Sequence, residues 1–144
     1  MPQKHMNYLL DTCIISELIK QEPNQKVIQW ISNIDEASLF ISVLTIGELH
    51  KGIEKLPESR KKNTLHKWVT YDLRRRFKNR IINFDIQTAT TWGKIQAKSE
   101  LSGKTLPAID GLIAATGFFH DLVVVTRNIK DMKASDVELL NPWA

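Results

Sequence analysis

Short apolar runs alternate along this chain with longer segments in which apolar residues recur every three or four positions. The runs are rich in Val, Ile and Leu, as strands are when helices cover both faces of a sheet. The clearest of them is Leu122–Thr126, which is apolar up to its final threonine. The other expected strands are Asn7–Leu10, Leu39–Val43, Arg80–Phe84 and Glu138–Leu140.

The segments between these runs have the apolar spacing of amphipathic helices, and capping or breaking residues stand at their ends. Asp85 precedes one of them and Gly103 follows it, while Pro23 and Pro57 interrupt the chain elsewhere. The expected helices are Cys13–Lys20, Gln25–Asn33, Thr45–Lys55, Ser59–Asn79, Ile86–Ser102 and Pro107–Phe119. Strands that alternate with helices predict a three-layer α/β/α fold with a mostly parallel central sheet.

Length and composition indicate one globular domain that spans residues 1–144. Hydrophobic residues make up 42% of the chain and charged residues 25%, which matches ordinary globular proteins. Residues 1–6 are mostly polar, and we expect a flexible start or a remnant of cloning there. The single cysteine, Cys13, excludes an internal disulfide framework. No apolar run approaches the ~18 residues of a membrane span, so we expect a cytoplasmic protein without a membrane partner.

Three acidic residues stand where predicted strands end or predicted helices begin: Asp11, Glu48 and Asp110. The carboxyl ends of parallel strands lie at one edge of a sheet, where ligands of open α/β folds bind. Carboxylates gathered there repel one another unless a cation neutralises them, and Mg²⁺ or Mn²⁺ prefers such oxygen ligands. The pattern therefore predicts a divalent-metal site that acts on phosphate esters.

Each acid also has a structural alternative. Glu48 follows Thr45 by three residues, which is the spacing of a capping box. Asp110 falls in the first turn of a helix, where the macrodipole favours a negative charge. Asp11 is placed to cap the helix that follows it. Taken singly these roles compete with a metal site, but three such coincidences at the sheet edge are much less probable than one.

Further candidates follow the last buried strand or stand beside the acids. Asn128 could supply an amide oxygen, and Asp131 could bind a metal directly or cap a turn. Arg127 could contact phosphate or pair with a nearby acid. The hydroxyls of Thr12, Ser42 and Thr126 are expected to hydrogen-bond water or phosphate from strand ends.

The charge of the chain is mildly basic, with a formal net charge of +4, but the cations are unevenly distributed. Nine Lys and Arg residues lie between Arg60 and Arg80, where Asp72 is the single acid. Such a run is either a solvated helix face or the surface of a nucleic-acid binder. Beside an acidic metal site we favour the second interpretation, with Arg75 and Arg76 contacting the nucleic acid.

Taken in order, four motifs resemble those of PIN domains of the VapC toxin family, in its FitB-like branch. The motifs are residues 9–18 (LLDTCIISEL), 41–49 (ISVLTIGEL), 107–116 (PAIDGLIAAT) and 125–128 (VTRN). The resemblance implies a Mg²⁺-dependent endoribonuclease toxin, held inactive by a VapB-like antitoxin and often homodimeric, in which Mn²⁺ can replace Mg²⁺. Asp11, Glu48 and Asp110 match the acidic triad of the family.

Two positions depart from the family pattern. Cys13 replaces the commoner Asn, and Asn128 stands where FitB-like members can carry Asp, which leaves Asn128 and Asp131 as alternatives for the fourth site residue. Two other functions stay open at this point. One is a PIN-fold nuclease of RNA processing that is not a toxin, and the other is a non-catalytic nucleic-acid-binding module.

Overall fold

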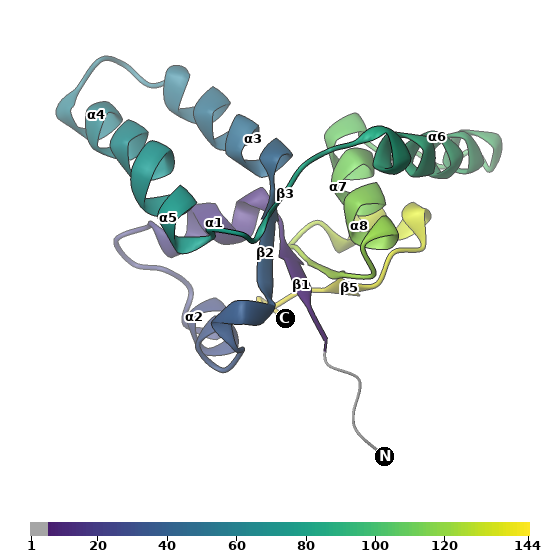
Figure 1. Cartoon of the computed structure of the whole chain (residues 1–144), viewed down its shortest axis with the longest axis horizontal. Coiled ribbons are helices and arrows are strands. Elements are labelled where there is room, and N and C mark those ends of the chain that lie inside the picture. The colour runs from purple at the N-terminus through teal and green to yellow at the C-terminus, as the bar shows by residue number, and fades with distance from the viewer. Residues whose placement is uncertain (1–5) are drawn as a thin grey trace.

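A computed structural model describes residues 6–144 and arranges them as a parallel sheet between two groups of helices (Figure 1). The flexible start expected at residues 1–6 therefore lies, apart from Met6, outside the described residues. The strands are β1 (Tyr8–Leu10), β2 (Leu39–Ser42), β3 (Ile81–Ile82), β4 (Val123–Val125) and β5 (Leu139–Leu140). The α-helices are α1 (Thr12–Leu18), α2 (Gln25–Ser32), α3 (Val43–Glu54), α4 (Arg60–Lys67), α5 (Arg74–Arg76), α6 (Ile86–Leu101), α7 (Ala108–Phe119) and α8 (Ile129–Met132).

The sheet has the strand order β3-β2-β1-β4-β5, and each described pairing is parallel. Tyr8 of β1 pairs with Leu39 of β2 and with Val123 of β4. Asp11, Ser42 and Thr126 each lie three residues after these paired positions, so the register places them side by side. The predicted three-layer architecture is confirmed, and the register sets several of the predicted site residues side by side.

Side chains of the central strands alternate between two apolar cores, as the pleat of a strand requires. In β1, Leu10 contributes to one core and Leu9 to the other. The Leu10 side is covered by α1, α3 and the segment between α4 and β3, and the Leu9 side by α7 and α8. Figure 1 shows these two groups of helices on opposite sides of the sheet, with α6 lying outside α7.

The long helix expected at Ser59–Asn79 is interrupted. It begins as α4, passes through a π-helical segment, Trp68–Leu73, and ends as α5. Gly117 lets α7 approach the sheet closely, because a Cβ at this position would lie 2.5 Å from Cγ2 of Val124. Among the residues that the structure describes, no helix has the length and apolar character needed to cross a membrane.

Candidate active site

Asp11 is held at the carboxyl end of β1 by four interactions. Its backbone N–H continues the sheet by donating to the Val125 carbonyl, at 3.0 Å. Its Oδ1 accepts the Thr12 N–H at 2.8 Å, which is the predicted cap of α1, and its Oδ2 accepts the Thr126 hydroxyl at 2.8 Å. The Cys13 thiol lies 3.9 Å from Oδ2. The side chain is buried, with 4% of its residue surface exposed, so it is fixed at the bottom of the site.

Glu48 joins this edge from α3 and does not cap its own helix. The capping-box alternative is wrong, because α3 begins at Val43 and is capped by the Ser42 hydroxyl, which accepts the Leu44 N–H at 3.0 Å. The Glu48 carboxylate instead accepts a hydrogen bond of 2.6 Å from the hydroxyl of Thr12. Of the three predicted strand-end hydroxyls, Ser42 therefore acts as a helix cap, while Thr12 and Thr126 each bind an acid.

Asp110 lies half-buried in the first turn of α7, and other acids surround it. Burial is the main cause that raises its pKa to about 6, and neighbouring carboxylates add to the rise. Those carboxylates are, in order of decreasing effect, Asp11, Asp131 and Glu48. Asp110 does lie in the first turn of α7, as its macrodipole alternative expects, but no cation is among the groups that act on its pKa.

The same repulsion reaches Asp11. Burial raises its pKa, and the charge of Glu48 acts in the same direction, although hydrogen bonds from Thr126 and Thr12 oppose the rise. The predicted acidic triad is thus brought to one edge of the sheet. Within this acidic cluster, the pKa values of Asp11 and Asp110 are raised, in part by the charge of Glu48.

Asn128 and Asp131 differ in how they face this cluster. Asn128 is exposed, its backbone N–H donates to the Thr126 hydroxyl at 2.9 Å, and its side chain forms no cap bond. Asp131 is exposed in the first turn of α8, and its charge contributes to the raised pKa of Asp110. Of the two alternatives for the fourth residue, Asp131 is the one whose carboxylate influences the cluster.

The donor chemistry of this edge suits a hard divalent cation, because carboxylate and hydroxyl oxygens dominate and no His or Lys is among the groups acting on Asp110. Within residues 6–144, however, no three His, Cys, Asp or Glu side chains form a ready metal-holding group as they stand. The neighbouring acids are close enough to raise the pKa of Asp110 and of Asp11 but are not arranged as a coordination shell. Side-chain movement would be needed to bind a metal.

Cys13 is half-buried beside the acids and accepts the Arg127 N–H at 3.4 Å. Burial, together with the charge of Asp11, raises the pKa of its thiol. The thiol therefore stays protonated at neutral pH. Its position links the turn after β4 to the start of α1.

The structure separates the basic run into two parts. Arg76 and Arg80 pair with Glu36, at 3.1 Å and 2.9 Å, and Arg80 also donates to the Leu39 carbonyl at the start of β2. This is the amino end of β2, opposite the edge that carries the acids. The exposed Arg75 belongs to the same short helix, α5, so neither of the two arginines expected to guide RNA is brought to the acidic cluster.

Other cations border one of two neighbouring hollows between α1, α3 and α4, which share lining residues and which we together call the α1–α4 groove. Thr12 and Glu48 stand at its inner end, and Ile19, Leu56 and Leu65 form shared apolar walls. The outer part, with a volume of about 900 Å³, is bordered by Lys20, Arg60 and Lys61. Sequence reasoning included Arg60 and Lys61 in the basic run but did not single them out, because only the packing of α4 shows where they face.

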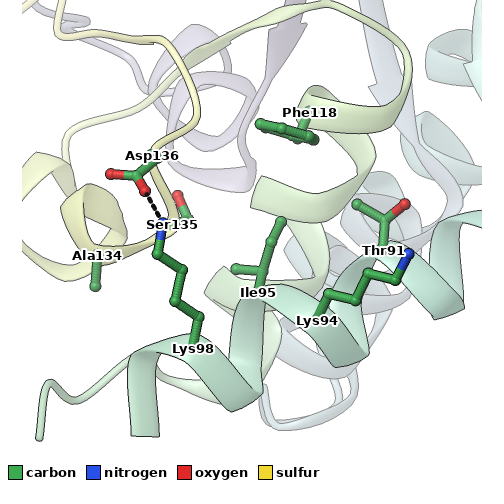
Figure 2. A pocket seen from close by; sticks show the side chains of 8 residues that line it. All are labelled: Thr91, Lys94, Ile95, Lys98, Phe118, Ala134, Ser135 and Asp136. Atoms are coloured by element: carbon green, nitrogen blue, oxygen red, sulfur yellow. Dashed lines mark hydrogen bonds and ion pairs between the residues drawn. The ribbon is translucent and has the colours of Figure 1, made fainter. Parts of the chain in front are cut away.

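A second hollow lies on the far side of α7, between α6, α7 and the turn Lys133–Ser135 (Figure 2). It has a volume of about 310 Å³, and Lys98 crosses it to pair with Asp136 at 3.0 Å. Its lining residues are Thr91, Lys94, Ile95, Lys98, Phe118, Ala134, Ser135 and Asp136. None of the predicted site residues is among them, so it is separate from the acidic cluster.

Comparison with known families agrees with this arrangement. The family model described as PIN domain matches residues 8–136, which covers β1 to the turn before β5 and all four acids. The chain belongs to the PIN domain family. Within it, the chain falls in the FitB-like branch of the VapC toxins, as its motifs predicted.

Three similar proteins define this placement. Toxin FitB of Neisseria gonorrhoeae is 36% identical over 135 residues, which cover 94% of this chain and 97% of that protein. VapC ribonuclease Y4jK of Sinorhizobium fredii is 30% identical over 135 residues, or 94% and 96% of the two chains. The solved structure of FitAB bound to an IR36 DNA fragment superposes with a TM-score of 0.89 at 34% identity, covering 95% of this chain and 96% of that one.

Proposed function

We propose that this PIN domain is a Mg²⁺-dependent endoribonuclease and the toxin of a toxin–antitoxin pair. The observation that carries the proposal is the gathering of four carboxylates at one edge of the sheet, where burial and the three neighbours of Asp110 raise its pKa. A protein gains nothing for its own stability by gathering acids in this way, and such clusters are typical of sites that bind something. The names of its relatives, a toxin and a VapC ribonuclease, support the same function.

Asp11 and Asp110 would hold the cation, with Glu48 binding it or orienting the attacking water. We assign the fourth position to Asp131 because its charge acts on Asp110. When bound, Mg²⁺ supplies Lewis acidity and offsets the negative charge that develops on the phosphate. Mn²⁺ offers the same chemistry.

The hydroxyls beside the acids have positioning roles in this mechanism. The Thr12 hydroxyl donates to Glu48 at 2.6 Å, which orients that carboxylate and leaves its other oxygen available to accept a proton from water. The Thr126 hydroxyl donates to Asp11 at 2.8 Å and opposes the burial that raises the pKa of this carboxylate. Ser42 contributes by starting α3, the helix that carries Glu48.

The α1–α4 groove is the better path for RNA than the α5 arginines. Its inner end includes Thr12 and Glu48, and Lys20, Arg60 and Lys61 lie along its outer border. Cations on such a path attract the phosphate backbone without reading its sequence. The same groove suits an antitoxin tail, because its apolar walls can bury aliphatic side chains while an arginine of the tail pairs with the acids.

The direct test is to incubate the purified, partner-free chain with total RNA and Mg²⁺, with and without a chelator. We expect cleavage only with Mg²⁺, and its loss in Asp110→Asn. Asp72→Asn, which removes an exposed carboxylate from the π-helical segment, is the matched control and should cut at the wild-type rate. Cleavage by Asp110→Asn at the wild-type rate would refute the site assignment, and cleavage in the presence of chelator would refute the metal requirement.

Salt dependence tests the RNA path. Each phosphate contact in single-stranded RNA adds about 0.7 to the slope of log affinity against log salt. We expect Lys61→Ala to flatten that slope and Arg75→Ala to leave it unchanged. The opposite result would return the guiding role to the α5 arginines.

The toxin assignment is tested in cells. Expression of the chain in a bacterial host should slow growth, and co-expression of an adjacent small gene for a DNA-binding protein should restore it. If the expressed chain is folded and cuts RNA in vitro but does not slow growth, the toxin assignment is refuted. The chain would then be a PIN-fold nuclease without a toxin role.

A further inference from the structure

Arg127 leaves the sheet at the border of the acidic cluster. The residue before it, Thr126, binds Asp11, and its own N–H binds the Cys13 sulfur at 3.4 Å. Its exposed side chain lies over the indole ring of Trp143, with Cζ 5.0 Å from the ring centroid. Among the residues that the structure describes, no oxygen accepts a hydrogen bond from its guanidinium group.

Trp143 is brought there by the neighbouring strand. β5 pairs with β4, and the Thr126 N–H donates to the carbonyl of Leu140, the last residue of β5, at 2.9 Å. The chain then turns at Asn141, whose side-chain oxygen accepts the Trp143 N–H at 2.9 Å, and Pro142 is buried. Arg127 and Trp143 therefore leave adjacent strand ends, and strand pairing fixes their relative position.

Glu17 of α1 lies near Trp143. This carboxylate is buried, pairs with Lys20 at 3.0 Å and accepts the Asn24 N–H at 3.1 Å. These two partners lower the pKa of Glu17, and Trp143 makes a smaller contribution in the same direction. Lys20 and the Asn24 N–H therefore compensate the buried charge of Glu17, and Trp143 is its neighbour.

We propose that Trp143 is a positioning residue that fixes Arg127 to bind an RNA phosphate at the border of the acidic cluster. The inference rests on the proposed ribonuclease function. Stacking on the indole uses the flat face of the guanidinium group. The N–H donors lie in the plane of that group and stay free for phosphate oxygens. Four nearby carboxylates repel RNA, and a cation held in one place at this border offsets the repulsion with a smaller loss of side-chain entropy on binding.

A double-mutant cycle separates positioning from packing. RNA binding is measured with a labelled single-stranded RNA in an Asp110→Asn background, so that the RNA is not cut. We expect Arg127→Ala to weaken binding about ten-fold at low salt and to flatten the salt slope by about 0.7. Trp143→Ala should have a similar or smaller effect, and the double variant should bind no more weakly than Arg127→Ala alone.

Two further variants complete the design. Trp143→Phe keeps an aromatic face and should retain most of the binding. Trp30→Ala removes another partly buried tryptophan that packs against the same core, so it controls for lost packing and should leave binding unchanged. In the cleaving protein, Trp143→Ala should raise KM for RNA more than it lowers kcat.

The outcomes distinguish this inference from the function on which it rests. Additive losses in the double variant, or equal losses in Trp143→Ala and Trp30→Ala, would overturn the positioning role while RNA cleavage by the wild-type chain stands. A wild-type chain that neither binds nor cuts RNA would overturn the proposed function and this inference together.

Discussion

Asp110→Asn should stabilise the metal-free protein while it abolishes cleavage. Burial and the charges of neighbouring acids raise the pKa of Asp110 from 3.8 to about 6, so near pH 7 the fold contains a carboxylate in an unfavourable setting. A rise of this size corresponds to at most about 3 kcal/mol. Because Asp110 is half-exposed, solvent screening reduces the expected gain to about 1–1.5 kcal/mol. For a domain of this length, that raises Tm by about 3–6 °C.

The gain should depend on pH in a defined direction. The folded state holds the Asp110 proton more tightly than the unfolded state, whose pKa is close to the ordinary value of 3.8. Stability from this group is therefore full below about pH 4, falls as the pH rises toward 6, and stays lowered above it. The asparagine variant does not titrate, so the difference between the two proteins should vanish near pH 4 and be complete near pH 7.

Thermal unfolding of both proteins in chelator across this pH range measures the difference. Glu22→Gln, in the exposed loop between α1 and α2, is the control for loss of one acid away from the cluster. An Asp110→Asn protein no more stable than wild type near pH 7, or a difference that does not change with pH, would show that the acids around Asp110 do not destabilise it.

Three further predictions concern the same edge of the sheet. Mg²⁺ should stabilise the wild-type protein but not Asp110→Asn, by up to about 2.7 kcal/mol in the free energy of unfolding when its concentration is 100 times Kd. Thermal unfolding measures this, and equal shifts in Tm for the two proteins would refute binding at this site. Thr126→Val should cost about 1–3 kcal/mol in denaturant unfolding, because it removes the hydroxyl that donates to Oδ2 of the buried Asp11 carboxylate, and a neutral effect would contradict that role. Gly111→Ala should cost less than about 1 kcal/mol in denaturant unfolding, since a Cβ there would lie 2.6 Å from Oε1 of Gln96 but the end of that flexible side chain can move aside. Gly93→Ala on the open face of α6 should be neutral or stabilising, and a loss of several kcal/mol in either variant would contradict this reasoning.

Local signals were sufficient for much of the fold. The apolar strand β4 and the cap at Asp11 are encoded in consecutive residues, because strand burial and helix capping depend on near neighbours. The placement of Asp11 and Asp110 at one edge followed from the parallel sheet, in which strand ends lie together. A local signal was misleading for Glu48. Its spacing from Thr45 fits a capping box, but its carboxylate accepts a hydrogen bond from Thr12, 36 positions away in the sequence.

Local sequence patterns were enough to predict most strands and helices, and hence that the acids lie together at one edge of the sheet. The residues that surround these acids depend on tertiary packing. The sequence does not show which way the side chains in a run of cations face, because this depends on how the helix packs. Packing places Arg76 against Glu36 at the opposite end of the sheet, and it places Lys61 at the α1–α4 groove. Likewise, strand pairing alone brings Arg127 and Trp143 together, because contacts between distant residues depend on register and packing, which no local pattern records.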